Sequence, residues 1–292
     1  MSGFLRGTGV ALATPFNEDG SIDYPGVTSL VDFCVKGNIE YLVVLGTTAE
    51  SVTLSKKDKV ELVNHIIKVN NKRLPLVVGI GGNNTQSILD EMKDTDLSDF
   101  DAILSVVPMY NKPTQEGIYQ HYKTINDNAP LPVLLYNVPS RTGTNMTAET
   151  TLRLAKLENI VGIKEAVGDF TQVLKIIKNK PQGFLVISGD DALALPAVAA
   201  GGDGVISVVG QGFPEEFSEM IRLGLAGQTQ KAFAILYSLL PVLDYAFEEG
   251  NPAGIKNILK IKGICDDYLR LPLVSVSKEL EGKIKKFIEN YK

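Results

Sequence analysis

The sequence predicts an α/β protein: a (β/α)8 TIM barrel with an appended C-terminal helical domain. Eight short apolar runs, rich in β-branched residues, recur between residues 9 and 210. Segments with helical periodicity separate these runs. Each run is nearly continuous in its hydrophobicity, as expected for parallel strands that are buried on both faces. A doubly wound parallel sheet is the structural alternative, but the series has no break that would divide such a sheet, and eight strand–helix units match the barrel.

The expected strands follow one another along the chain at intervals long enough for a helix. They are GVALATP (9–15), YLVVLG (41–46), LPLVVGIG (74–81), AILSVVP (102–108), PVLLYNVP (132–139), IVGIKEA (160–166), FLVISGD (184–190) and DGVISVVG (203–210). Helices are expected between them, for example over residues 57–71 and 147–159, the second with Thr147 as its N-cap. The chain after residue 224 reads helical throughout. We therefore expect a barrel domain over residues 1–224 and a C-terminal helical domain over residues 225–292.

Composition limits the classes of function. The 292 residues are 44% hydrophobic, and 29 basic residues against 34 acidic ones give a net charge of −5. No basic stripe marks a surface for nucleic acid or for a membrane. Cys34 and Cys265 form neither a CxxC motif nor a disulfide framework, which indicates a reducing compartment. The N-terminus is a poor signal peptide and no segment is long and apolar enough to span a membrane, so we expect a cytoplasmic protein.

In a TIM barrel the active site lies where the strands end, and here those ends carry polar groups. Hydroxyls, phenols, a guanidinium and an amine occur in GTTAES (46–51), PMYNKP (108–113), YNVPSRTG (136–143), at Lys164, in SGDD (188–191) and in ISVVG (206–210). His65 and His121 each lie in a helical segment, where helix packing or solvation is the more common role of a histidine. We therefore expect no metal site.

Lys164 lies where the strand IVGIKEA should end. Because residues two apart share a face of a strand, Gly162, Lys164 and Ala166 point together, away from Ile163 and Glu165. A lysine between two small residues has room inside the barrel, where desolvation favours the uncharged, nucleophilic amine. Such an amine forms Schiff bases with carbonyl compounds. A structural lysine paired with a carboxylate explains this strand equally well.

The neighbouring strand ends suit the same chemistry. Tyr136, at the end of the fifth strand, supplies a phenol for proton relay during imine formation. Thr47 and Thr48, on a turn led by Gly46, offer hydroxyls and free backbone N–H groups to a carboxylate, although such a pair is usually only a helix cap. Arg141 lies in a loop rich in proline and glycine, where most arginines are solvated; binding of a substrate carboxylate is the alternative.

Six motifs, in order along the chain, resemble the signatures of the dihydrodipicolinate synthase family. They are GTTAES, PMYNKPTQEG, LLYNVPSRTG, GIKEA, SGDDAL and GGDGVISV. The wider group contains N-acetylneuraminate lyase and other pyruvate-dependent class I aldolases. The resemblance runs from the first strand to the eighth and continues into the C-terminal segment, where NPAGIKNILK and LRLPL resemble further elements of the family.

The resemblance implies an activity and a role for each site residue. The activity is condensation of pyruvate with L-aspartate-4-semialdehyde to 4-hydroxy-tetrahydrodipicolinate, in diaminopimelate and lysine biosynthesis, without a cofactor or metal. The resemblance implies that Lys164 forms the Schiff base with pyruvate and that Tyr136 transfers protons, in a relay that continues through Thr47 to Tyr110. It also implies that Thr48 and the backbone at Ile206 bind the pyruvate carboxylate and that Arg141 binds the semialdehyde carboxylate. In this family that last tyrosine of the relay reaches the site of a neighbouring subunit. This implies a homodimer or a homotetramer, a dimer of dimers.

Three other functions are alternatives. A lyase acting on a sugar-like aldehyde would use the same imine, but Arg141 resembles the synthases rather than the sugar-acid lyases. An inactive barrel that only binds or regulates is disfavoured, because all four catalytic positions are retained. A Rossmann-type dehydrogenase is indicated only by GIGGNN, in which Asn84 leaves the G-x-G-x-x-G pattern incomplete. One departure from the family pattern, Ala49 in place of glycine, matters only if that position needs a positive φ.

Many synthases of this family are inhibited by lysine, which binds in a cleft between subunits. On alignment with GTTAES and GIGGNN, the two histidines of that cleft become Lys56 and Lys59, its glutamate becomes Ser87, its asparagine is Asn83 and its tyrosine becomes Met109. Lys56 and Lys59 would then place two cations where the family has neutral hydrogen-bond acceptors, and Ser87 would leave the cleft without its carboxylate. The alternative is that both lysines are solvated and turned away from the cleft. We expect weak inhibition by L-lysine or none.

Overall fold

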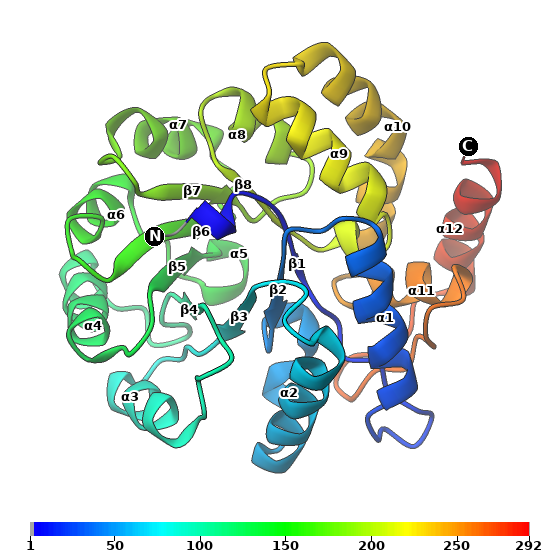
Figure 1. The fold of residues 1–292 in the computed structure, drawn as a ribbon, viewed down its shortest axis with the longest axis horizontal. Coiled ribbons are helices and arrows are strands. Elements are labelled where there is room, and N and C mark those ends of the chain that lie inside the picture. Colours follow the sequence, from blue (N-terminus) through cyan, green and yellow to red (C-terminus); the bar gives the residue numbers. More distant parts are fainter. Residues whose placement is uncertain (1–2, 292) are drawn as a thin grey trace.

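In the computed structural model, which describes residues 3–291, eight parallel strands close into a barrel (Figure 1). The strands are β1 (Gly7–Ala11), β2 (Tyr41–Val44), β3 (Leu76–Gly79), β4 (Ala102–Val106), β5 (Val133–Asn137), β6 (Ile160–Glu165), β7 (Leu185–Ser188) and β8 (Gly204–Ser207). They pair in chain order, and β1 also pairs with β8. The predicted fold class is confirmed, and each predicted run overlaps one strand. Most strands are shorter than their runs, because the last apolar residues, such as Val209, already belong to the following turn.

Helices surround the barrel and form the C-terminal region. The α-helices are α1 (Tyr24–Lys36), α2 (Lys56–Asn70), α3 (Thr85–Asp94), α4 (Gln115–Asn128), α5 (Pro139–Thr142), α6 (Ala148–Leu154), α7 (Phe170–Asn179), α8 (Ala194–Ala199), α9 (Pro214–Leu225), α10 (Thr229–Glu248), α11 (Ala253–Ile261) and α12 (Lys278–Asn290). Short 3-10 helices are η1 (Gly3–Leu5), η2 (Thr47–Ala49), η3 (Ser51–Thr53) and η4 (Val209–Gln211). Thr147 caps α6 as predicted, since its side chain accepts a hydrogen bond from the Thr150 N–H.

Two apolar clusters separate the inside of the barrel from its outside. The inner cluster contains Leu5, Ala11, Tyr41, Val43, Val77, Ala102, Leu104, Leu134, Tyr136, Val138, Leu185, Ile187 and Ile206. The outer cluster lies between the strands and the helices around them. Leu5 of η1 belongs to the inner cluster and lies just before the start of β1, so η1 covers the end of the barrel at which the strands begin. The opposite end, where the strands finish, is left for a binding site.

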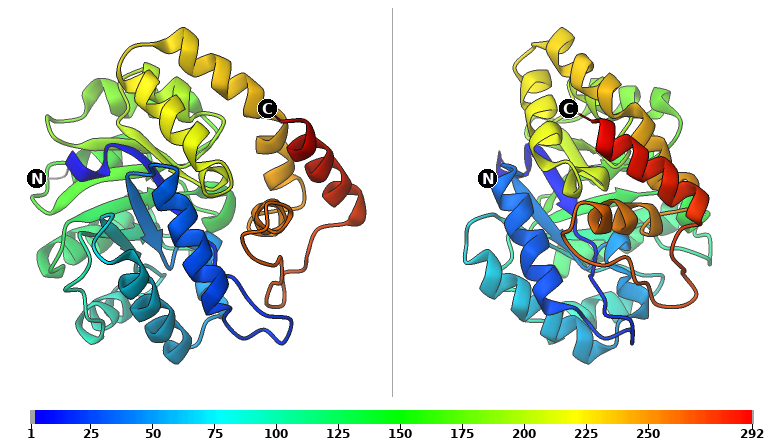
Figure 2. Two further views of the ribbon diagram at one scale, coloured as in Figure 1. Left: turned by 45° about the vertical axis from the view of Figure 1, so that its right-hand side comes forward. Right: turned by 90° about the vertical axis from the view of Figure 1, so that its right-hand side faces the viewer.

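The C-terminal helices α10, α11 and α12 lie on one flank of the barrel, with α10 packed against α9 (Figures 1 and 2). The outer cluster continues into them through Leu236, Ile255 and Ile284. They therefore share a core with the helices of the barrel. The division into domains between residues 224 and 225 stays an interpretation; it falls at the end of α9.

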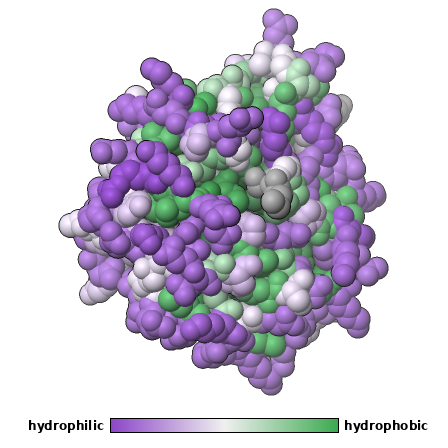
Figure 3. Space-filling view, turned by 60° about the vertical axis from the view of Figure 1, so that its left-hand side comes forward, coloured by the Kyte–Doolittle hydropathy of each residue, from purple (hydrophilic) through white to green (hydrophobic). Residues whose placement is uncertain are grey.

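Hydrophilic residues cover most of the face shown in Figure 3, with apolar patches between them. No helix in the described part of the chain has both the length and the apolar character needed to cross a membrane.

On the outer face of β5 and β6, a buried polar cluster links the two strands. Asn137 and Glu165 lie opposite each other in the strand register, and Asn137 Nδ2 donates to Glu165 Oε1 at 2.9 Å. Gln172 Nε2 of α7 donates to Glu165 Oε2 at 3.1 Å, and the Val167 N–H donates to Oε1 at 3.0 Å. Burial raises the pKa of Glu165 to about 7, against the opposing effect of these hydrogen bonds. Glu165 therefore fixes the register of β6 rather than lining the barrel.

The raised pKa of Glu165 predicts how stability depends on pH. The folded protein holds this proton more tightly than an unfolded chain, whose glutamate has a pKa near 4.5. The contribution of Glu165 to the free energy of unfolding is therefore fully present below pH 4.5 and is lost as the pH rises to about 7. Glu165→Gln removes this titration. The unfolding free energy of the wild type minus that of the variant should decrease across this interval by on the order of 1 kcal/mol per pH unit.

Denaturant unfolding at a series of pH values, followed by circular dichroism, measures this difference. Glu18→Gln, at an exposed position in the loop before α1, is the matched control for the loss of one carboxyl group. A difference for Glu165→Gln that changes with pH no more than the difference for Glu18→Gln would contradict the prediction.

Candidate active site

A cavity of about 610 Å³ opens where the strands end, and five of the predicted site residues line it: Thr47, Thr48, Tyr136, Arg141 and Lys164. They lie on β5 and β6 and on the short helices η2 and α5, which follow β2 and β5. Further lining residues come from the C-terminal region, namely Leu243, Asp244, Phe247 and Glu248 of α10 and Asn251 beyond it. The cavity therefore lies between the mouth of the barrel and the C-terminal helices.

Lys164 lies inside the barrel at the end of β6 and is only 5% exposed. Its Nζ lies 4.3 Å from the centroid of the Tyr136 ring, because β5 and β6 pair with these two residues opposite each other. Gly189 of the next strand end gives the lysine stem its space, since a Cβ at this position would lie 3.0 Å from Lys164 Cε. Among residues 3–291, no ion pair involves Lys164. The structure thus gives no support to a structural lysine held by a carboxylate.

The two threonines lie on η2, directly after β2. Thr48 is 1% exposed, and its Oγ1 accepts a hydrogen bond from Asn251 Nδ2 at 3.1 Å. The residue with a positive φ in this turn is Glu50, at 53°. Ala49 therefore does not occupy a position that requires glycine, and this departure from the family pattern carries no backbone strain.

Arg141 lies on the single-turn helix α5, which begins with a proline after β5. One guanidinium nitrogen donates to the Asn251 carbonyl at 3.2 Å. The side chain lines both the main cavity and a second one of about 310 Å³. Since a guanidinium has five N–H donors, most of them are available to a ligand that enters between the two cavities.

Two predicted site residues are not brought to the cavity. Tyr110 is 88% exposed and lines neither cavity, so the predicted connection from Tyr136 through Thr47 to Tyr110 is not assembled within one chain. Ile206 lies on β8 within the inner cluster and is fully buried, whereas Val208, two residues later, lines the main cavity.

The second cavity shares Thr47, Tyr136 and Arg141 with the first and also contains Lys59, Glu91 and Met109. The expectation that this region lacks an anion is wrong. Glu91, one helical turn after Ser87 on α3, lies 3.6 Å from Lys59 Nζ and forms an ion pair with it. The alignment compared only the position of Ser87 and so missed a carboxylate that reaches the same space from the next turn.

Sequence reasoning assigned no role to two further lining residues, Asp191 and Asn251. Asp191 is 3% exposed, and its Oδ2 accepts hydrogen bonds from the N–H groups of Val208 and Val209 at 3.1 and 3.0 Å. Burial raises the pKa of Asp191 to about 6. Both residues lie in motifs that the sequence singled out, SGDDAL and NPAGIKNILK, but nothing local in those motifs says what the side chains contact.

The histidines pack between helices. His121 of α4 contacts Thr85 Oγ1 through Nδ1 at 2.8 Å, and burial lowers its pKa to about 4. His65 of α2 contacts Thr28 Oγ1 through Nε2 at 2.9 Å. Within residues 3–291, no group of three or more histidine, cysteine or acidic side chains is arranged to hold a metal ion.

Comparison with known proteins agrees with this geometry. Residues 4–291 match the Dihydrodipicolinate synthetase family. A 4-hydroxy-tetrahydrodipicolinate synthase of Flavobacterium psychrophilum is 54% identical over 288 residues, which cover 98% of each chain. Among solved structures, a monomeric dihydrodipicolinate synthase variant has a TM-score of 0.95 at 36% identity, over 98% of this chain and 96% of that one. The dihydrodipicolinate synthase of Acinetobacter baumannii, solved in complex with pyruvate, has a TM-score of 0.94 at 36% identity, over 98% of each chain.

Proposed function

The chain belongs to the dihydrodipicolinate synthetase family, and from this membership we propose how its residues carry out the family's reaction. The enzyme condenses pyruvate with L-aspartate-4-semialdehyde to 4-hydroxy-tetrahydrodipicolinate, a step of diaminopimelate and lysine biosynthesis, and is a lyase. The alternatives of a sugar-acid lyase, an inactive barrel and a dehydrogenase are set aside, because relatives that span nearly the whole chain carry the synthase name.

The observation that carries the proposed mechanism is the buried Lys164 amine beside the Tyr136 ring. The Nζ atom attacks the keto carbon of pyruvate, and loss of water leaves an imine. Tyr136 transfers the protons, as its place on the adjoining strand allows. Loss of a proton from the methyl group then gives an enamine, whose carbon attacks the aldehyde carbon of the second substrate. The amino group of the semialdehyde then replaces Lys164 Nζ at the imine carbon, which closes the ring and frees the lysine. The imine serves as the electron sink, so the proposed steps call for no metal or cofactor.

Two groups are proposed to hold the substrate carboxylates. Thr48, with the backbone near Ile206, binds the carboxylate of pyruvate, and Arg141 binds that of the semialdehyde. The position of Arg141 at the junction of two cavities supports this assignment, because a second substrate can reach it without displacing pyruvate from Lys164.

We further propose that the enzyme assembles as a homodimer or a homotetramer. Tyr110 is 88% exposed and has a φ of 70°, a conformation that residues other than glycine seldom adopt. Such strain at an exposed tyrosine is consistent with a side chain that completes the site of a second subunit. Location in the cytoplasm stays a prediction.

Covalent chemistry at Lys164 is tested by trapping. Borohydride reduction in the presence of pyruvate should leave an adduct on Lys164, detectable by peptide mass spectrometry. Lys164→Met should give none, and the buried Lys256 should remain unmodified in both proteins. An adduct on a different lysine, or none at all, would contradict the assigned nucleophile.

Arg141→Ala tests the second carboxylate site. Loss of charged hydrogen bonds to the semialdehyde should lower kcat/KM for that substrate by roughly tenfold to a hundredfold. Trapping of pyruvate on Lys164 should be little changed. Arg153→Ala is the matched control, because Arg153 pairs with Glu116 on the surface at a half-exposed position. Wild-type kinetics for Arg141→Ala would show that the semialdehyde carboxylate binds elsewhere.

Weak inhibition by L-lysine, or none, is also expected. Lys59 and Glu91 already pair with each other in the second cavity, so an added lysine would have to separate them before either group could serve it. A titration of the synthase rate with L-lysine measures the effect. Strong inhibition at low millimolar lysine would refute this expectation.

A further inference from the structure

Glu50 and Lys256 form a buried ion pair between the active-site turn and the C-terminal region. Lys256 Nζ lies 2.6 Å from Glu50 Oε1, and both side chains are 0% exposed. Glu50 directly follows η2, whereas Lys256 lies on α11. Lys256 Nζ also donates to the Tyr268 carbonyl at 2.8 Å and lies 4.2 Å from the centroid of the Phe16 ring. The Glu50 contact joins the loop after β2 to α11, and the other two contacts hold Lys256 against the segment after α11 and the loop after β1.

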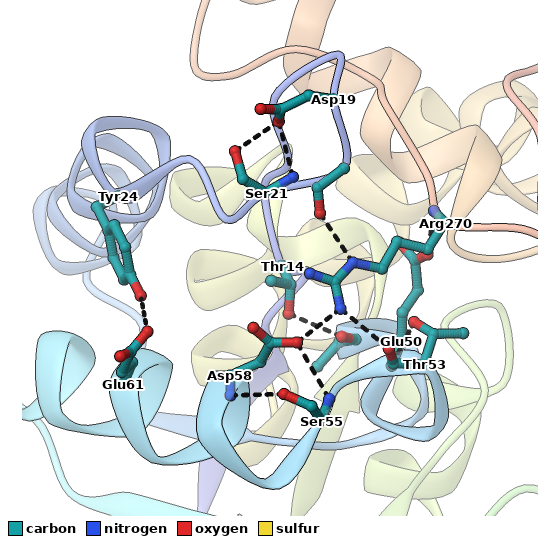
Figure 4. A network of polar contacts seen from close by, with 12 residues as sticks. Thr14, Asp19, Ser21, Tyr24, Glu50, Thr53, Ser55, Asp58, Glu61 and Arg270 are labelled. Carbon is teal, nitrogen blue, oxygen red and sulfur yellow. Dashed lines mark hydrogen bonds and ion pairs between the residues drawn. The ribbon is translucent and has the colours of Figure 1, made fainter.

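The second oxygen of Glu50 has a partner from the same region. Glu50 Oε2 accepts a hydrogen bond from the Arg270 N–H at 3.1 Å. The Arg270 guanidinium extends along the same loop, donating to the Thr53 carbonyl at 3.0 Å and to Asp58 Oδ2 at 2.8 Å (Figure 4). The C-terminal segment therefore holds the loop between β2 and α2 at several points, with Glu50 nearest to η2.

Each residue after Thr47 in the turn has a partner outside it. Thr48 Oγ1 accepts from Asn251, and the Ala49 carbonyl accepts from Thr14 Oγ1 at 2.7 Å. Glu50 itself has a φ of 53°, in the left-handed region. A residue other than glycine stays in this region only where its surroundings over-determine the backbone. The two hydrogen-bonded carboxylate oxygens of Glu50 supply that constraint.

We propose that the Glu50–Lys256 ion pair positions the η2 turn, and with it Thr48, for the binding of pyruvate, so that the C-terminal region takes part in substrate binding. The inference rests on the role proposed above for Thr48. Neither Glu50 nor Lys256 lines the cavity, so both are positioning residues that act through the turn.

A role in stability alone explains the pair less well. Removing two charges from water offsets much of their attraction, so apolar residues of similar volume often stabilise a core as well as a buried ion pair does. The ion pair fixes the position of Glu50 relative to α11, because charged hydrogen bonds are short and directional. A shift of about 1 Å in a substrate-binding group is enough to slow a reaction greatly. The pair therefore fits a requirement for exact placement of the turn.

Three variants separate positioning from stability. Lys256→Met leaves Glu50 buried without its cation, and Glu50→Gln combined with Lys256→Met removes both charges at nearly constant volume. Lys260→Met is the matched control: Lys260 lies one turn further along α11 and pairs with Asp267 and Glu281 while 41% exposed. Because neutral replacement of both partners is tolerated better than a single unpaired charge, the double variant should fold even where Lys256→Met does not.

The readouts are thermal unfolding and steady-state kinetics for each substrate. The double variant should unfold close to the wild-type temperature yet lose kcat/KM for pyruvate by roughly tenfold to a hundredfold. The loss for the semialdehyde should be smaller, and Lys260→Met should match the wild type for both substrates. Unchanged kcat/KM for pyruvate would overturn the inference, as would a double variant that does not fold, since the pair would then serve stability. Failure of the proposed function is distinguishable, because it would show as a wild type that traps no pyruvate on Lys164.

Discussion

The pairing of β5 with β6 is the constraint on which the active site depends. It sets Tyr136 opposite Lys164 and, one residue later, Asn137 opposite Glu165. Side chains alternate along each strand, so the first pair faces the cavity and the second faces the helices outside. A slip of one residue would exchange these faces and place the carboxylate, not the amine, inside the barrel. The hydrogen bond between Asn137 and Glu165 opposes such a slip at the point where it would abolish the chemistry.

Two buried carboxyl groups near this register have raised pKa values. Glu165 and Asp191 are both buried, and in each case burial raises the pKa above its ordinary value. Both nevertheless accept hydrogen bonds from groups that fix strand ends, Asn137 for the first and the N–H groups after β8 for the second. Lys164, which directly precedes Glu165 in the chain, forms no ion pair within residues 3–291. The polar groups around the lysine thus hold the scaffold and leave the amine free to react.

Much of the fold and part of the site were predictable from sequence, because the signals are local. Apolar runs located every strand, Thr147 marked the start of α6, and alternation along β6 placed Lys164 inside the barrel. The contacts made by Asn251 and Lys256 were not predictable, because these residues reach the turn after β2 from 203 and 206 positions away. Glu91 was missed for a related reason: a one-to-one alignment does not show which side chain of the next helical turn enters a cavity.

Glu50 and Lys256 are 206 positions apart and are therefore synthesised at different times. A nascent chain leaves the ribosome from its N-terminus, and its early parts fold first. All eight strands precede α11, so every strand of the barrel is synthesised before Lys256. On the role proposed for the ion pair, the turn that carries Thr48 reaches its final position only when α11 docks. A chain that ended before α11 would keep the contact between Thr14 and the Ala49 carbonyl but would leave the Glu50 carboxylate without its cation.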